Sequence, residues 1–175
     1  SLIDLRFLAG EAAVVGDLAD RLEADGFPAH AAGFVEWLEK GNKERGRTYG
    51  DAGGMLEPDL KNGLGGLRDW QQVRWLMRLD PGREADARHL ADDLAALEDD
   101  ARFVLTARMH LHRLCGRKND KLYFEFQERV AEAMGFGRRG DRQAVERFLS
   151  LLLRRMADIK ALRQSVWPLL AGHLG

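Results

Sequence analysis

The chain has 175 residues, a formal net charge of −1 and 31% charged residues, so no strong field directs it to nucleic acid or to an anionic membrane. Its single cysteine, Cys115, excludes an intrachain disulfide and favours a reducing compartment, so we expect a cytoplasmic protein. The sequence shows no secretory signal and no apolar run of about 18 residues, so we expect no membrane-spanning segment.

Residues 2–8 are apolar apart from Asp4 and Arg6, and they fit either a short strand or the start of a helix. Apolar residues at helical spacing then predict helices at residues 11–25 and 29–46. The first of these helices would present Val14, Leu18 and Leu22 on one face.

Residues 50–66 are predicted to form a loop, because repeated glycines and a proline deny them regular structure. Further apolar stripes predict helices at 67–79, 84–116, 122–134 and 141–167. Pro168 is expected to end the last of them. No alternating strand pattern follows residue 10, so we predict an all-α, antiparallel helical bundle. Its four tryptophans are expected to be packing residues: Trp37, Trp70, Trp75 and Trp167.

One stretch, EPDLKNGLGGLRDWQ at residues 57–71, concentrates chemically informative residues around a helix start. Its candidates for binding phosphate or ordering the loop are Lys61, Gly63, Gly65, Gly66, Arg68 and Asp69. The glycines would free backbone N–H groups to face an anion, and the two cations would add donors suited to phosphate. The stretch is not a P-loop, because no Gly-Lys-Ser/Thr closes it. A tight connection between two helices, with the aspartate in the first helical turn, remains the alternative.

This stretch resembles the Glu-Pro-x-x-Lys-x-Gly-x-Gly-Gly-Leu-Arg-Asp signature of the bifunctional uridylyltransferase/uridylyl-removing enzymes that modify the PII nitrogen-signalling protein. SLIDLRFLAG at residues 1–10 is similar to the end of their catalytic region. DKLYFEFQERVAEAMGF at residues 120–136, with VERF at 145–148, resembles their helical region. The resemblance therefore spans nearly the whole chain, in the same order.

The resemblance implies that residues 1–10 end a nucleotidyltransferase domain and that residues 11–175 form a helical domain containing the glycine-rich loop. The parent enzyme would transfer UMP from UTP to a tyrosine of PII, with Mg²⁺ held by carboxylates. Asp4 lies about where a third metal-binding carboxylate would stand, and a surface aspartate beside Arg6 is the alternative. The family's Asp-x-Asp is absent, so the chain alone is expected to be inactive and to hold no metal. We read the chain as a segment of a longer protein.

A second group of candidates follows from the long predicted helix. Arg108 interrupts its apolar seam, and His112 lies one turn later on the same side. The candidates for a polar cleft are Arg108, His112, Arg117, Asp120 and Gln127. In the resembled enzymes an Arg-x-x-x-His pair followed by arginine and aspartate occupies this region. The alternative is an arginine at the edge of the seam that reaches to water.

Two other functions remain open from the sequence. The amphipathic helices and the missing catalytic residues also fit a non-catalytic helical module that binds a partner protein. A simpler nucleotidyltransferase family, fused to CBS modules, shares a looser version of the pattern.

Overall fold

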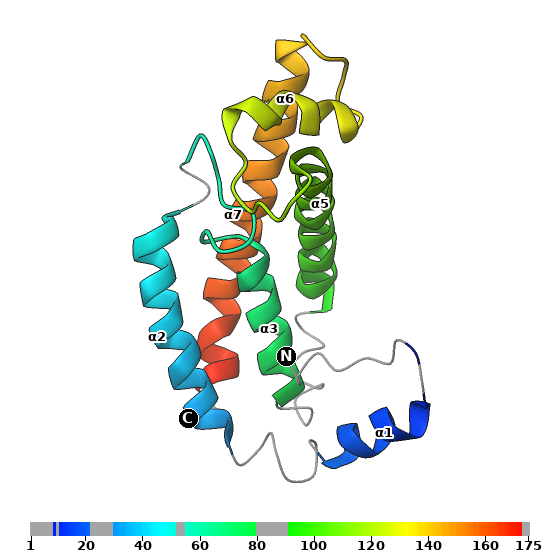
Figure 1. Cartoon of the computed structure of the whole chain (residues 1–175). Helices are drawn as coiled ribbons and strands as arrows, with labels where there is room; N and C mark the ends of the chain where they lie inside the picture. The colour runs from blue at the N-terminus through cyan, green and yellow to red at the C-terminus, as the bar shows by residue number, and fades with distance from the viewer. Residues whose placement is uncertain (1–8, 10, 22–29, 52–54, 80–90, 173–175) are drawn as a thin grey trace.

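The computed structural model describes residues 9, 11–21, 30–51, 55–79 and 91–172. Within these residues the chain forms helices and two isolated β-bridges but no strand, which confirms the all-α prediction (Figure 1). The helices are α1 (Ala12–Arg21), α2 (Ala31–Tyr49), α3 (Leu67–Leu79), α5 (Ala91–Cys115), α6 (Phe124–Ala133) and α7 (Arg142–Ala171). The segment 2–8 and its Asp4 lie outside the described residues, as do residues 84–90.

The 30-residue helix α7 is the axis of the fold, because α3, α5 and α6 all pack against it (Figure 1). Its first turn is capped by Asp141, whose side chain accepts a hydrogen bond from the Ala144 N–H at 3.0 Å. Apolar side chains at three- and four-residue steps along α7 are fully buried, namely Phe148, Leu152, Met156 and Ile159. A matching row on α5 comprises Leu97, Ala101, Val104, Ala107 and Leu111. Each of the larger side chains stabilises the fold by about 1.5–3 kcal/mol, so these two rows hold the bundle together.

The predicted helix at 67–79 coincides with α3, and the other predicted bounds that fall on described residues agree with the helices within about one turn. The predicted bounds at 25, 29 and 84 lie outside the described residues. The exception to the agreement is the end of α7, which Pro168 does not terminate. A proline within a helix loses one backbone hydrogen bond and costs about 3 kcal/mol. The last turn nevertheless persists, because Val166 and Ala171 are buried and the Gly172 N–H donates to the Pro168 carbonyl at 3.0 Å. Packing therefore outweighs the proline at this position.

A second apolar cluster joins α2, α3 and the end of α7. Its buried members are Val35, Leu38, Trp75, Leu76, Leu79 and Ala171. Trp75 is the packing residue that the sequence predicts, and Trp70 and Trp167 lie at the margins of the two clusters. Trp37 is not a core residue, since it is 64% exposed and stacks on the Phe34 ring with the centroids 5.8 Å apart.

Helix α1 is amphipathic as predicted, but its apolar face is not buried. Val14 is 62% exposed, and α1 contributes no buried residue. The spacing of apolar residues therefore predicted the helix correctly, but it did not show whether the apolar face would be buried. Among the described residues, every helix is too short or too polar to cross a lipid bilayer.

Candidate functional site

The glycine-rich loop is folded back on itself before α3 begins. The carboxylate of Asp59 accepts hydrogen bonds from the backbone N–H groups of Lys61, at 3.0 Å, and Asn62, at 2.6 Å. This is the local turn that aspartate favours, and it fixes the backbone at Lys61 and Asn62. The Leu67 and Arg68 N–H groups then donate to the carbonyls of Leu60 and Lys61, which closes the loop onto the first turn of α3.

A short antiparallel pairing fastens the loop to the segment before α6. The Leu60 N–H donates to the Asp120 carbonyl at 2.8 Å, and the Leu122 N–H donates to the Pro58 carbonyl at 3.0 Å. Asp59 and Lys121 form the bridge between these two bonds. The pairing joins two segments about 60 residues apart, so Lys61 on one side and Asp120 on the other become neighbours.

Two glycines allow the loop to approach other backbone closely. Gly65 has φ +85°, and a Cβ at this position would lie 2.2 Å from the Met156 carbonyl oxygen of α7. A Cβ on Gly66 would lie 2.8 Å from the Lys61 carbonyl oxygen. The glycines are therefore required by the packing of the loop on α7 and on itself.

Asp69 anchors the loop from beneath. Its side chain is fully buried and accepts a hydrogen bond from the Gly65 N–H at 2.7 Å. The same carboxylate forms an ion pair with Arg45 of α2 and lies 3.6 Å from Nε of Arg163 of α7. The cations that reach Asp69 therefore come from α2 and α7, far from it in the sequence.

The hydrogen-bond network around Asp69 continues through side-chain amides. The Gln72 side-chain amide donates to Asn42 Oδ1 at 2.8 Å, and Arg163 Nε donates to Gln72 Oε1 at 3.2 Å. Arg45 also donates to Asn42 Oδ1 at 2.9 Å and to the Asn62 carbonyl at 3.1 Å. The network thus joins α2, α3 and α7 to the loop through groups that are mostly buried.

Asp120 forms a second centre on the other side of the loop. Its Oδ1 accepts a hydrogen bond from Arg108 Nε at 2.7 Å and lies 3.3 Å from His112 Nε2. The sequence placed these two α5 side chains on one face, and the structure brings both onto Asp120. Burial would raise the pKa of Asp120, but the Arg108 hydrogen bond and charge, followed by His112 and Lys61, hold this pKa below its usual range. Asp120 is therefore a carboxylate that stays ionised among cations.

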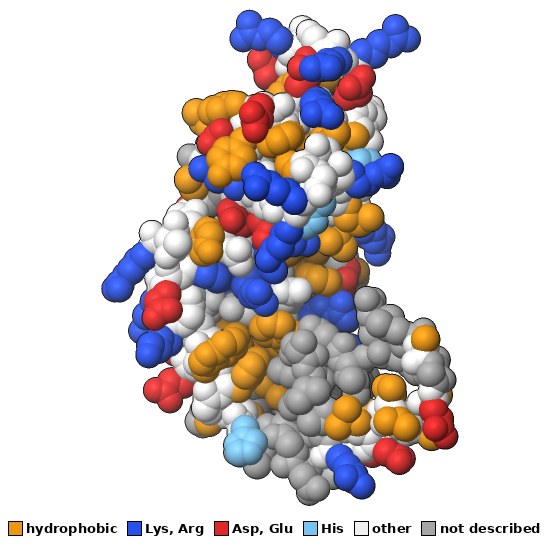
Figure 2. Space-filling model, in the orientation of Figure 1, with side chains coloured by type: hydrophobic (Ala, Val, Ile, Leu, Met, Phe, Trp, Pro, Cys, Tyr) orange, Lys and Arg blue, Asp and Glu red, His pale blue; other side chains and the backbone are white. Residues whose placement is uncertain are grey.

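Positive charge is in excess around Asp120. Four cations interact electrostatically with one another or with Asp120, and we call them the basic cluster: Lys61, Arg68, Arg108 and Lys118. Burial lowers the pKa of Lys61, and Arg68, Lys118 and Arg108 lower it further against the opposing effect of Asp120. Burial and Arg45 likewise lower the pKa of Arg68. Figure 2 shows that Lys and Arg side chains gather across the middle of one face.

The loop backbone does not offer the open row of N–H groups that its glycines suggested. The N–H groups of Gly65, Gly66 and Leu64 donate to Asp69, to the Gly63 carbonyl and to the Gly50 carbonyl. The expectation of an amide cradle for phosphate is therefore corrected, because the fold uses these donors itself. What remains available to a ligand is the set of cationic side chains.

The other two predicted cleft residues lie elsewhere. Gln127 is buried, and its amide donates to the Leu56 carbonyl at 2.7 Å and to the Leu122 carbonyl at 3.3 Å, so it ties the loop to α6. Arg117 is exposed beyond the end of α5. Lys118, which the sequence did not single out, is the neighbour whose charge acts on Lys61.

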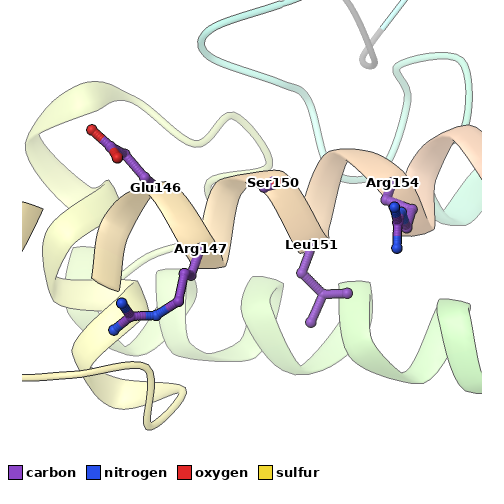
Figure 3. Close-up of a pocket in the computed structure, with 5 residues that line it drawn as sticks. All are labelled: Glu146, Arg147, Ser150, Leu151 and Arg154. Carbon is purple, nitrogen blue, oxygen red and sulfur yellow. The ribbon is translucent and has the colours of Figure 1, made fainter. Parts of the chain in front are cut away.

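Two hollows on the surface do not involve the predicted site. One, of about 410 Å³, is lined by Glu146, Arg147, Ser150, Leu151 and Arg154. Figure 3 shows that all five belong to α7, with Arg147 and Leu151 on one side and Glu146 on the other. A shallow hollow of about 560 Å³ lies between α2 and the end of α7. Neither collects converging polar groups, so neither is assigned a function.

Within the described residues, no group of three or more His, Cys, Asp or Glu side chains is placed to hold a metal ion. The carboxylates nearest the loop already bind arginines or loop amides, so these residues do not fit the Mg²⁺ that the resemblance implies. Asp4, the candidate metal-binding carboxylate, lies outside the described residues.

Several residues of the site were missed from the sequence. Asp59 could have been identified from its sequence context. In a turn, an aspartate commonly accepts hydrogen bonds from the N–H groups two and three residues later, which here belong to Lys61 and Asn62. Nothing in the sequence pointed to Arg45 and Arg163. They lie 24 and 94 positions from Asp69 and resemble the solvated charged residues of other helices.

Comparison with known proteins places this chain in a family. Residues 34–167 match the model of the GlnD PII-uridylyltransferase family. The chain is 34% identical over 159 residues, 85% of its length, to the bifunctional uridylyltransferase/uridylyl-removing enzyme of Phenylobacterium zucineum. It is 32% identical over 196 residues, 99% of its length, to the enzyme of the same name from Gluconobacter oxydans.

The chain spans only 16% and 20% of the lengths of these two relatives. No solved structure gives a significant match. The family match covers the glycine-rich loop, both carboxylate centres and most of α7, which confirms the resemblance found in the sequence. The chain therefore belongs to the GlnD PII-uridylyltransferase family.

Proposed function

We propose that the chain is the helical portion of a nucleotidyltransferase that transfers UMP from UTP to a tyrosine of PII, and that its basic cluster binds the triphosphate. Residues 1–10 would end the catalytic domain, and residues 11–175 would form the helical domain. Mg²⁺ belongs to the proposed reaction by resemblance, and no described residue is assigned to it. The unpaired cysteine supports a cytoplasmic location.

The observation that carries the proposal is the surplus of cations at the loop. The interactions described around Lys61 include one ionised carboxylate, that of Asp120. They also include the four cations of the basic cluster: Lys61, Arg68, Arg108 and Lys118. Burial that lowers the pKa of Lys61 and Arg68 means that their charged forms are disfavoured in the isolated fold. An anionic ligand would relieve this cost, and a triphosphate matches a cluster of several cations in charge and in hydrogen-bonding capacity.

The loop supplies the rigidity that such a site needs. Lys61 and Arg68 flank a turn whose backbone donors are bound internally and whose glycines contact α7 and the loop itself. Positioned cations stabilise negative charge that develops on phosphate oxygens during transfer. The helical portion would therefore close over the triphosphate, and without the Asp-x-Asp carboxylates it would not catalyse transfer alone.

The competing function is a non-catalytic module that binds a protein. Its specific support is that the loop N–H groups are satisfied within the fold and do not face a ligand. Family membership favours PII uridylyltransferase over the CBS-fused nucleotidyltransferases.

Calorimetric titration of the chain with UTP, with and without Mg²⁺, tests the proposal. The double charge reversal Lys61→Glu/Arg68→Glu should abolish saturable binding. The control Arg138→Glu/Arg142→Glu makes the same change in net charge at two exposed arginines near the start of α7, and it should leave binding intact. Equal binding by wild type and the loop variant, or no binding by wild type, would overturn the triphosphate site and leave the loop as a structural or docking element.

A further inference from the structure

A patch of exposed apolar side chains lies beside the glycine-rich loop. Leu56 is 75% exposed, Phe124 is 59% exposed and Tyr123 is 41% exposed. We call these three residues the apolar patch. Figure 2 shows orange side chains gathered near the start of α6, with blue side chains next to them. Exposed large apolar groups that adjoin one another are typical of interaction surfaces.

Hydrogen bonds hold the backbone of the patch residues close together. The bridge between Asp59 and Lys121 joins the loop to the segment before α6, and Leu56 and Phe124 each lie three residues from this bridge. Two further bonds hold the segments together, from the Phe124 N–H to Glu57 Oε1 at 3.0 Å and from the Gln127 amide to the Leu56 carbonyl. The three apolar side chains are therefore presented by a braced backbone, not by independent loops.

The patch is continuous with the basic cluster. Lys121 Nζ lies 5.0 Å from the centroid of the Tyr123 ring and 3.4 Å from Glu57 Oε2. Lys121 is next in sequence to Asp120, whose carboxylate is bound by Arg108 and influenced by Lys61. Because Glu57 balances the charge of Lys121, the surplus positive charge near the patch comes from the basic cluster.

Several other exposed apolar residues lack this connection. Trp37, Met109 and Leu169 are 64%, 57% and 52% exposed, but no contact described here ties them to the loop that carries Lys61. A group-transfer enzyme must hold its acceptor close to the phosphate that is attacked. The apolar patch is bonded to the loop of the proposed triphosphate site, and Met55 is a further exposed apolar residue of that loop.

We propose that the apolar patch, with the nearby basic cluster, docks the acceptor protein. The partner is a folded protein that presents an apolar side chain flanked by carboxylates. The assignment rests on the proposed uridylyl transfer, because it uses the adjacency of patch and triphosphate site. Apolar contacts supply affinity at the centre, and the cations select and steer an acidic partner.

The test measures two ligands on the same variants. Purified PII protein is titrated into the chain, and UTP is titrated separately. Leu56→Ser/Phe124→Ser should weaken PII binding by about tenfold or more, the loss expected when two side chains at the centre of an interface are truncated. UTP affinity should stay unchanged, since neither side chain belongs to the basic cluster. The control Met109→Ser/Leu169→Ser removes two apolar side chains of similar exposure and should leave PII affinity within about twofold.

Tyr123→Ser separates docking from folding. Tyr123 occupies the N-cap of α6 without a side-chain capping bond, so serine should maintain or raise the stability of the helix while PII binding falls. Wild type that fails to bind PII, or patch variants that bind like wild type, would overturn the docking surface. A loss of UTP binding only in Lys61→Glu/Arg68→Glu would still support the triphosphate site, so failures of the two proposals are distinguishable.

Discussion

Replacement of Asp69 by asparagine tests whether the buried carboxylate holds the glycine-rich loop in place. Asp69 is fully buried and binds the Gly65 N–H and Arg45, with Arg163 at 3.6 Å. Asparagine keeps the volume, so no cavity forms, but it deprives Arg45 and Arg163 of the carboxylate that they share. These groups are only 11% and 14% exposed, so water cannot replace the carboxylate. Removal of one partner from such a buried ion pair costs about 3–5 kcal/mol.

The loss can be measured by urea denaturation. For a slope of about 2–3 kcal/mol per molar urea, the midpoint should fall by about 1–2.5 M with the slope unchanged. Thermal melts should show a Tm lower by about 6–20 °C for a chain of this size. The matched control is Asp99→Asn, because Asp99 pairs with Arg102 at 66% and 74% exposure. It should cost less than about 0.5–1 kcal/mol.

A second variant identifies the source of the loss. Asp69→Asn/Arg163→Met removes one of the cations that the first change strands, so it should recover part of the stability. Positive coupling between the two changes is expected because the groups lie in one network. If Asp69→Asn unfolds within about 1 kcal/mol of wild type, the anchor is not the carboxylate, and the reasoning from burial and charge is refuted.

Three further changes probe the loop and the basic cluster. Burial lowers the pKa of Lys61, so Lys61→Met should keep or raise Tm while UTP binding falls, and a lower Tm with unchanged binding would contradict this. Gly65→Ala should lower the free energy of unfolding by several kcal/mol in urea denaturation, because at φ +85° its Cβ would lie 2.2 Å from a backbone oxygen of α7. The control Gly116→Ala, at φ +63° in open space, should cost about 1–2 kcal/mol. Equal costs for the two variants would argue against the close approach of the loop to α7. Arg108 holds the pKa of Asp120 below its usual range although burial acts in the opposite direction, so the stabilising contribution of this carboxylate is present above about pH 4 and is lost as the pH falls through the lower folded-state pKa. The stability difference between wild type and Asp120→Asn should therefore shrink below about pH 4, and a constant difference from neutral pH into acid would exclude that account.

Local patterns predicted the helices well and the loop chemistry less well. The apolar stripe at 67–79 gave both ends of α3, because a glycine pair precedes it and its apolar side chains recur at helical spacing. The same reasoning failed at Pro168, where burial of the last turn of α7 outweighs a local preference. Packing between distant segments decides such cases, and a single sequence window does not contain it.

The candidate site divides in the same way. Arg108 and His112 could be placed on one face from their spacing, and both do reach Asp120. Asp69 was recognised as an organiser of the loop, but its partners Arg45 and Arg163 could not be found, because only the fold brings α2 and α7 to it. The use of the loop N–H groups was also hidden, since it depends on which acceptors the fold supplies.

The two carboxylates on either side of the loop have similar partners but different access to solvent. Asp69 has no exposed surface, whereas the side chains of Asp120, Arg108 and His112 are 12%, 18% and 28% exposed. An anion from solution can therefore compete with Asp120 for Arg108, whereas Arg45 and Arg163 share a carboxylate that solvent does not reach. The buried network around Asp69 therefore makes the loop rigid, and the partly exposed cations around Asp120 are the groups that can bind a charged ligand. Lys61 lies on the loop that connects them, so its position is set by the first centre and its electrostatic environment by the second.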